Sequence, residues 1–251
     1  GSGGFGNNNF ANPRVVTGSS GSVTGSNVGA NKEAGEPAHA GNSGGASLWY
    51  QWQAPASGSM TLTTAGSNFD TLLAVYTGST LNGLTAVASN DDVTSFDRSS
   101  KVTFNAVAGT TYRIAVDGFN GATGNIAFNW NGNNFFADAE ALSGGSGEVN
   151  GNNFGTTKEA GEPAHAGFFG GSSVWYRWQA PASGAVTFST MGSNFDTLLA
   201  VYTGGGVGAL ATVVGNDDEA HPTVLTSKVT FNAAAGTTYR IAVDGYDAAA
   251  G

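Results

Sequence analysis

The 251-residue chain contains the same sequence pattern twice. Residues 32–41 read KEAGEPAHAG, and residues 158–167 repeat these letters. Residues 66–78 likewise return unchanged at 192–204. The second copy is displaced by 126 residues, from Lys32 to Lys158, which is far longer than the roughly 20–50 residues of solenoid repeats. Each copy is therefore expected to be a whole domain, an organisation typical of modular surface or extracellular proteins.

The amino-acid composition limits the fold classes and the kinds of binding partner that fit this chain. Forty glycines and only 11% charged residues favour short strands joined by turns, because glycine suits turns and destabilises helices. With a net charge of −9, the chain lacks the basic surface that a nucleic-acid-binding protein requires. No apolar run approaches the roughly 20 residues of a transmembrane helix. The chain has no cysteine, which excludes thiol catalysis and thiolate metal sites.

Apolar residues alternate with polar ones in several short runs, which predicts strands. Leu48, Tyr50 and Trp52 share one face of such a run. Residues 71–76 and 197–202 are continuously apolar and are expected to be strands covered on both faces. The predicted fold class is all-β, with two tandem antiparallel β-sandwich (jelly-roll-like) domains. The predicted boundaries are residues 1–131, which include a Gly/Asn-rich N-terminal segment, and residues 132–251.

The second copy lacks the last strand that is predicted for the first. Residues 125–130 alternate Asn, Ile, Ala, Phe, Asn and Trp, whereas Gly251 aligns with Gly124. A missing strand leaves ladder hydrogen-bonding groups and part of a core uncovered. Two interpretations remain open: the chain is a piece of a longer repeat protein, or a neighbouring subunit supplies the strand by complementation.

Acidic residues recur at matching positions of both copies. Carboxylate and amide oxygens on loops are the ligands that calcium requires, since it takes about six to eight oxygens. The alternative is that Asn and Asp only form turns by bonding to their own backbone. The candidate ligands of Ca²⁺ are Glu33, Glu36, Asp70, Asn90, Asp91 and Asp92 in the first copy, and Glu159, Glu162, Asp196, Asn216, Asp217 and Asp218 in the second.

Two tryptophans are candidates for ligand binding. Trp49 and Trp175 point away from the neighbouring Tyr and Trp if the strand alternation holds. An exposed aromatic platform suits a sugar ring or a protein partner, and the alternative is burial under a covering loop. The sequence shows no convincing nucleophile, acid and histidine set, so we expect the chain not to be an enzyme.

The ordered combination of these motifs resembles a known family, the bacterial pre-peptidase C-terminal domain. The resembling segments are residues 47–55, 68–76, 90–92 and 111–118, and their counterparts at 173–181, 194–202, 216–218 and 238–245. The resemblance implies a jelly-roll β-sandwich outside the cell. It also implies oxygen ligands at Asp70, Asp91 and Asp92, with Glu33 and Glu36 as contributors, because some relatives bind calcium through acidic loops. Other relatives bind protein or glycan substrates for an attached hydrolase.

Two functions therefore remain open. The first, which we favour, is a non-catalytic extracellular structural repeat protein, namely a calcium-stabilised subunit of a filament, surface layer or adhesin stalk at the cell surface. Such a subunit would form a homo-oligomer or polymer through self-association, with strand complementation between subunits. The alternative is a glycan- or protein-binding accessory module of a secreted hydrolase. An exposed groove at Trp49 and Trp175 would favour the alternative.

Overall fold

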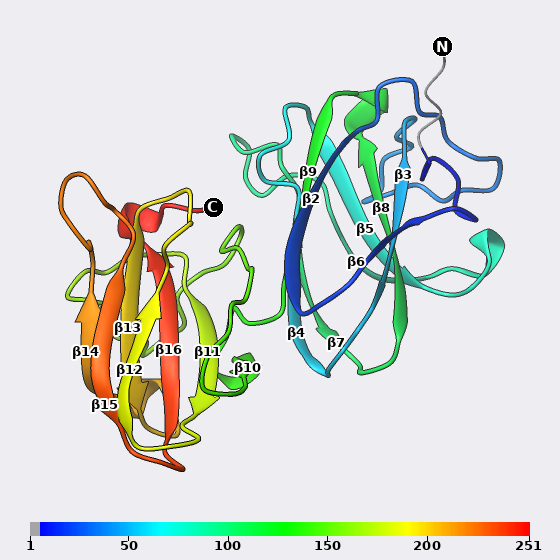
Figure 1. Ribbon diagram of the computed structural model, residues 1–251. Helices are drawn as coiled ribbons and strands as arrows, with labels where there is room; N and C mark the ends of the chain where they lie inside the picture. The colour runs from blue at the N-terminus through cyan, green and yellow to red at the C-terminus, as the bar shows by residue number, and fades with distance from the viewer. Residues whose placement is uncertain (1–5) are drawn as a thin grey trace. The chain divides into compact units, whose positions relative to one another are not determined.

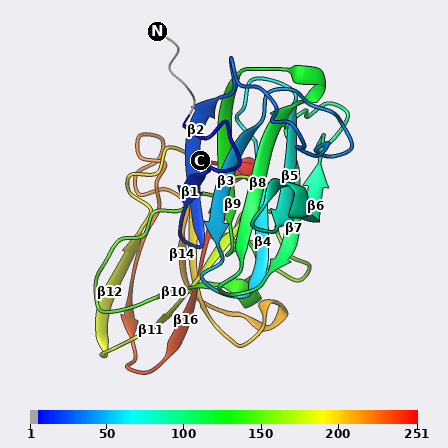
Figure 2. The same ribbon diagram turned by 90° about the vertical axis from the view of Figure 1, so that its right-hand side faces the viewer.

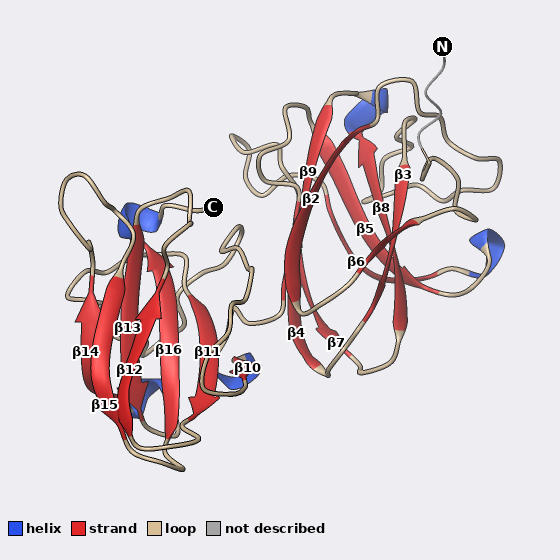
Figure 3. Cartoon of the chain, in the orientation of Figure 1, coloured by secondary structure: helices blue, strands red, loops and turns tan. Residues whose placement is uncertain are grey.

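The protein is all-β, as predicted. The structure, a computed structural model, describes residues 6–251, so the glycine-rich first five residues lie outside the described part. Strands joined by loops make up this part, and helical conformation is confined there to short 3₁₀ turns (Figures 1 and 3). No helix within the described part is both long and apolar enough to cross a membrane. Contacts divide the chain into two units, Gly1–Trp130 and Asn131–Gly251.

The first unit consists of two sheets. The larger sheet has the order β1-β3-β8-β5-β6 and is formed by β1 (Arg14–Val16), β3 (Leu48–Gln53), β5 (Thr71–Thr77), β6 (Thr85–Asn90) and β8 (Thr111–Gly118). The smaller sheet has the order β2-β9-β4-β7 and is formed by β2 (Ser20–Ser26), β4 (Gly58–Thr63), β7 (Lys101–Ala106) and β9 (Asn125–Asn131). The neighbours β4 and β7 lie side by side in Figure 2. The 3₁₀ turns of this unit are η1 (Leu81–Gly83) and η2 (Phe119–Gly121).

The core of the first unit lies between these two sheets. Tyr50 on β3 contacts Phe128 on β9 with ring centroids 4.7 Å apart, and Trp52 contacts Tyr112 at 5.7 Å. Leu62 on β4 belongs to the same buried cluster. Burying a large apolar side chain stabilises a fold by about 1.5–3 kcal/mol. The predicted alternation of Tyr50 and Trp52 toward one face is therefore confirmed.

The outer face of the larger sheet is also covered. Trp49, Ala74 and Tyr76 form a second buried cluster there with Phe10, which comes from the loop that precedes β1. As a result, the first six residues of β5 are all buried. Its counterpart in the second unit has the same burial pattern. The prediction of two strands covered on both faces is confirmed.

One strand pair in each unit departs from the expected antiparallel arrangement. β1 runs parallel to β3, with Arg14 opposite Tyr50, and the second unit repeats this pairing. Residues 17–47 separate the two strands, and a parallel pair needs a crossover of a dozen or more residues. The prediction missed this pair because a short strand such as Arg14–Val16 shows almost no alternation.

The second unit repeats the larger sheet but not the smaller one. The larger sheet has the order β10-β11-β16-β13-β14 and is formed by β10 (Glu140–Leu142), β11 (Val174–Gln179), β13 (Thr197–Thr203), β14 (Ala211–Asn216) and β16 (Thr238–Gly245). The smaller sheet consists of β12 (Gly184–Ser189) beside β15 (Lys228–Ala233) (Figure 1). The 3₁₀ turns are η3 (Phe136–Asp138), η4 (Val207–Ala209) and η5 (Tyr246–Ala248).

Candidate functional site

Three of the predicted acidic residues meet at one edge of the larger sheet. Asp70 directly precedes β5, and Asp91 and Asp92 directly follow β6. The start of β5 lies beside the end of β6, because the two strands are antiparallel with Leu73 opposite Asn90. One carboxylate oxygen from each aspartate lies within 4.8 Å of the others. We call this group the first aspartate cluster.

The first aspartate cluster leaves several oxygens without protein partners. The Oδ1 atoms of Asp70, Asp91 and Asp92 are buried and accept no hydrogen bond. Burial and the neighbouring charges of Asp92 and Asp70 raise the pKa of Asp91 above its ordinary value, although Arg98 opposes the shift. Buried oxygens of like charge are costly unless a cation or donor satisfies them. A metal ion would supply that missing charge.

One arginine provides part of the counter-charge. Arg98 Nη1 donates a hydrogen bond to Asp70 Oδ2, while 64% of the arginine side chain remains exposed. An exposed ion pair contributes little to stability because water screens it. The arginine therefore neutralises one carboxylate of the cluster without closing the cluster off from solvent. Sequence reasoning missed this residue because it lies on the loop after the aspartates and has no counterpart in the second copy.

The second unit contains an equivalent group, which we call the second aspartate cluster. One oxygen each from Asp196, Asp217 and Asp218 lies within 4.8 Å of the others, and their Oδ1 atoms are again buried without partners. Burial and the charge of Asp218 raise the pKa of both Asp196 and Asp217. Leu225 occupies the position of the arginine, and His221 Nδ1 instead lies 2.6 Å from Asp218 Oδ2.

The predicted asparagine ligands have a different role. Asn90 Oδ1 accepts a hydrogen bond from the Lys101 amide at 2.9 Å, and its Nδ2 donates to the Asp92 carbonyl at 3.1 Å. Asn216 Oδ1 accepts from the Lys228 amide at 3.1 Å. Both asparagines thus hold the loop backbone beside a cluster. Each amide oxygen thus already accepts a backbone hydrogen bond, as in a turn-forming residue, and the assignment of both asparagines as metal ligands stays a prediction.

The predicted glutamates also lie outside the aspartate clusters. Glu33 Oε2 accepts a hydrogen bond from the Phe10 amide at 2.5 Å, and Glu36 Oε2 accepts from the Glu33 amide at 2.9 Å. Glu36 Oε1 lies 2.8 Å from His39 Nε2, and His39 Nδ1 lies 2.8 Å from the Tyr76 hydroxyl. These contacts fasten the KEAGEPAHAG loop over the sheet.

The same loop chemistry recurs in the second unit. Glu159 Oε2 accepts from the Phe136 amide at 2.5 Å, and Glu162 Oε1 lies 2.8 Å from His165 Nε2. Burial alone raises the pKa of Glu162, but the hydrogen bonds with His165 and the Glu159 amide help to outweigh it and leave the pKa below its ordinary value. The carboxyls of Glu33, Glu36, Glu159 and Glu162 therefore stabilise loops outside the aspartate clusters. One oxygen each from Glu36 and Glu162 also lies within 4.8 Å of ligand atoms of a histidine and an aspartate, namely His39 and Asp117 in the first unit and His165 and Asp244 in the second. The assignment of the four glutamates as calcium ligands stays a prediction.

The two candidate aromatic platforms are buried. Trp49 and Trp175 each have an exposed fraction of 0%. Trp49 does face away from Tyr50, as the alternation predicts, but Phe10 and His39 cover it with ring centroids 5.1 Å and 5.6 Å away. The covering loops come from distant sequence, which strand alternation cannot reveal. Neither tryptophan forms an exposed ligand-binding surface.

The aspartate clusters have the donor set for a metal ion. Three carboxylates on adjoining loops match the preference of hard divalent cations for oxygen ligands. Backbone carbonyls and water complete such sites in other proteins. The unpartnered buried oxygens are the observation that fits this chemistry.

Comparison with known proteins agrees with this architecture. Residues 46–118, which run from just before β3 to the end of β8 and contain the first aspartate cluster, match the model of the family described as bacterial pre-peptidase C-terminal domain. No curated protein matches the chain. The second unit repeats the larger sheet of the first with the same strand order. The chain therefore resembles two bacterial pre-peptidase C-terminal domains in tandem, with the family match itself falling on the first.

Proposed function

We propose that the chain is a non-catalytic, extracellular accessory module that binds calcium and presents a surface to a glycan or protein substrate of a secreted hydrolase. The family match over residues 46–118 carries this proposal, because domains of this family are non-catalytic and occur in secreted bacterial proteins. The duplicated aspartate clusters support the calcium part of it. Each cluster offers three carboxylates, to which carbonyls and water would add the remaining oxygens.

The loops beside the clusters provide the candidate binding surface. Phe96 follows the first aspartate cluster by a few residues and is 98% exposed. In the second unit, Val224 and Leu225 are exposed on the corresponding loop. An exposed apolar group on a loop that a bound ion rigidifies suits a protein or sugar partner, because less conformational entropy is lost on binding. These loops replace the buried tryptophans as the surface to test.

Calorimetric titration with Ca²⁺ tests the metal sites. Asp91→Asn together with Asp92→Asn should weaken binding at the first cluster by about tenfold or more, since calcium affinity depends on the charge of its ligands. Glu148→Gln is a matched control, because it removes an exposed carboxyl on another loop. Unchanged binding in the double variant would contradict the assignment of the first cluster.

A binding screen tests the surface. The calcium-loaded chain is exposed to glycan and protein panels, and any ligand is tested again with Phe96→Ala. Val107→Ala serves as the control, since Val107 is 59% exposed on a different loop. Loss of binding in the first variant alone supports the proposed surface, and equal binding by both variants contradicts it.

The structural-subunit function is a second candidate. The observation that favours it is the repetition of the larger sheet, with the same strand order, in two successive units of the chain. Sedimentation velocity with Ca²⁺ and with EDTA separates the two functions. An accessory module is expected to sediment as a monomer in both buffers, whereas large species that require calcium would favour a filament or surface-layer subunit.

A further inference from the structure

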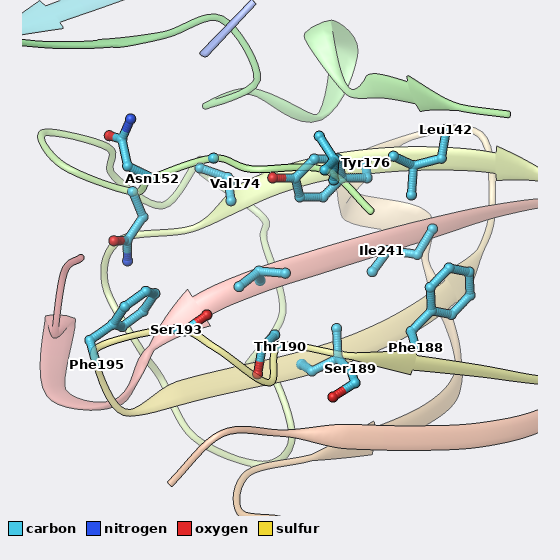
Figure 4. Close-up of a pocket in the computed structure, with 15 residues that line it drawn as sticks. Leu142, Asn152, Val174, Tyr176, Phe188, Ser189, Thr190, Ser193, Phe195 and Ile241 are labelled. Atoms are coloured by element: carbon cyan, nitrogen blue, oxygen red, sulfur yellow. The ribbon is translucent and has the colours of Figure 1, made fainter. Parts of the chain in front are cut away.

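Three aromatic side chains of the second unit form an exposed patch. Phe168, Phe169 and Tyr246 have exposed fractions of 40%, 85% and 37%, and the rings of Phe168 and Tyr246 meet edge to face with centroids 5.1 Å apart. We call these three residues the aromatic patch. It is separate from the pocket of the same unit, which is lined by residues of both sheets such as Leu142 and Phe188 (Figure 4).

The first unit has polar residues at two of these three positions. Asn42 and Ser43 are the counterparts of Phe168 and Phe169 at the offset of 126 residues. Asn42 Nδ2 donates to Asn120 Oδ1 at 3.2 Å, and Asn42 Oδ1 accepts from the Asn120 amide at 3.1 Å. The same loop therefore forms with polar side chains, so the fold does not require the two phenylalanines.

The exposure of the patch is a property of the loops that carry it. Ser43 and Asn120 are also exposed in the first unit, where the smaller sheet has four strands. Their counterparts in the second unit, Phe169 and Asp247, are exposed as well. An exposed apolar side chain gains no stability from burial, and contiguous exposed apolar groups on a soluble domain mark interaction sites. The two phenylalanines therefore indicate binding.

Hydrogen bonds hold the loop that carries both phenylalanines. Lys158 Nζ donates to the Phe169 carbonyl at 2.7 Å. Asp244 Oδ1 is buried and accepts from the Gly171 and Ser172 amides at 2.9 Å and 2.7 Å. The first unit holds its loop with the equivalent lysine and aspartate. Because the loop is already ordered, little conformational entropy of the protein would be lost when a ligand binds to the rings.

Carboxylates border the aromatic patch. The Tyr246 amide donates to the Asp196 carbonyl at 3.0 Å, so the patch adjoins the second aspartate cluster. Asp247 follows Tyr246 in the chain and is exposed. Burial raises the pKa of Asp196, and the charge of Asp247 adds to this rise, which shows that the two carboxylates interact. The apolar rings therefore have hydrogen-bond acceptors and negative charge beside them.

The size and surroundings of the patch indicate the class of its ligand. With roughly 200 Å² for each aromatic side chain, the three exposed fractions amount to about 300 Å². A stable protein interface covers about 800 Å² per partner, which is more than twice this area. A sugar ring is smaller, and it combines an apolar C–H face with hydroxyl groups around its rim. The face suits the aromatic rings, and the hydroxyl groups suit the neighbouring carboxylates as hydrogen-bond donors.

We propose that the aromatic patch is a binding subsite for neutral polysaccharide, in which a sugar ring stacks on Phe169 and its hydroxyl groups donate to Asp247. An uncharged glycan is favoured over an anionic one, because Asp247 and the second aspartate cluster repel negative charge. The subsite rests on the proposed function, a binding module, and adds to it a ligand class and a site that requires no metal ion.

Affinity electrophoresis in native gels tests the subsite, since the net charge of −9 carries the chain through the gel. Separate gels contain hydroxyethyl cellulose, galactomannan, dextran or, as the anionic comparison, alginate, and each is run with Ca²⁺ and with EDTA. Phe168→Asn together with Phe169→Ser copies the residues of the first unit. Met191→Ala is the matched control, because Met191 is 79% exposed on another loop of the same unit and its counterpart is Ala65.

Thermal unfolding is measured for every variant. Both variants should unfold at the temperature of the original chain, because exposed side chains away from special backbone positions contribute little to stability. Phe169→Ala serves as a further variant if the double variant is less stable, since it removes one side chain that is 85% exposed.

At least one neutral polysaccharide should retard the chain equally with Ca²⁺ and with EDTA. The double variant should weaken this binding by about tenfold or more because it removes two aromatic contacts, whereas the Met191 variant should bind like the original chain. Retardation by alginate alone would overturn the subsite. So would equal retardation of the double variant and the original chain, or no retardation by any of the polysaccharides.

The outcomes also separate the subsite from the proposed function. Binding that Phe96→Ala abolishes and that the double variant retains would leave the binding module in place and remove the subsite. Binding that persists in EDTA and depends on Phe169 would support the subsite even if calorimetry detected no calcium at either aspartate cluster.

Discussion

Asn27→Ala should unfold the first unit at a much lower denaturant concentration, because this side chain ties three backbone segments together. Asn27 Nδ2 donates to the carbonyls of Ala46 and Ala122 at 3.0 Å and 3.1 Å, and its Oδ1 accepts from the Gly124 amide at 2.8 Å. The side chain is completely buried. It therefore joins the loop before β3 to the start of β9.

The magnitude follows from these three hydrogen bonds. Each contributes about 1 kcal/mol net, and each buried backbone group that loses its partner costs about 1–3 kcal/mol. Alanine supplies no replacement donor or acceptor, so we expect a loss of about 3 kcal/mol or more. For a unit of this size, the loss corresponds to a drop in unfolding temperature of about 10 °C.

Urea denaturation followed by hydrogen exchange of peptides from each unit is the assay, because it assigns each transition to its unit. Asn31→Ala is the control, since Asn31 is exposed and its hydrogen bond with Asn8 lies at the surface. Asn153→Ala should destabilise the second unit in the same way, because Asn153 makes equivalent bonds. A loss below about 1 kcal/mol for Asn27→Ala would refute the reasoning.

Three further predictions concern other parts of the chain. Trp49→Ala should cost about 3–5 kcal/mol in urea denaturation because the ring is fully buried, whereas Phe96→Ala should change stability by less than about 0.5 kcal/mol. The pKa of Glu36 lies below its ordinary value of 4.5, so its ionised form stabilises the first unit above that pH. This stability should be lost as the pH falls through the folded-state pKa, and urea denaturation of Glu36→Gln at several pH values should show a flatter profile. Arg98→Leu, which copies Leu225 of the second unit, should tighten calcium binding at the first cluster severalfold in calorimetry, because it removes a competing cation.

The sequence predicted those features that depend on local pattern. Alternation identified the inward faces of Tyr50 and Trp52, and continuous apolar residues identified β5 as doubly covered. The order of the strands also predicts that the acid before β5 lies near the acids after β6. The start of one strand and the end of its antiparallel neighbour lie at the same edge of a sheet. The pairing of such neighbouring strands can be predicted from their order along the chain and from the period of their apolar residues alone.

The features that were missed depend on segments that return from elsewhere in the chain. Trp49 is covered by Phe10 and His39, which no strand pattern can place. The backbone amides and the histidine that contact Glu33 and Glu36 likewise become neighbours of these carboxyls only in the folded loop. The identical KEAGEPAHAG loops therefore indicated that both copies need these residues. The sequence did not show which groups the loop residues contact in the fold.

A layer of hydroxyl groups beneath the first aspartate cluster explains how an acidic site can keep its shape. Thr71 Oγ1 lies 2.6 Å from Thr64 Oγ1 and 2.9 Å from Ser100 Oγ, which is within 2.7 Å of the Asp91 carbonyl. The second unit has the same chain of contacts. Because these bonds hold the backbone, the carboxylates need not find partners among themselves, and their unpartnered oxygens keep a fixed arrangement. The side chain that contacts the acids can then differ between the copies, Arg98 in the first and His221 in the second, without moving the strands that position the acids.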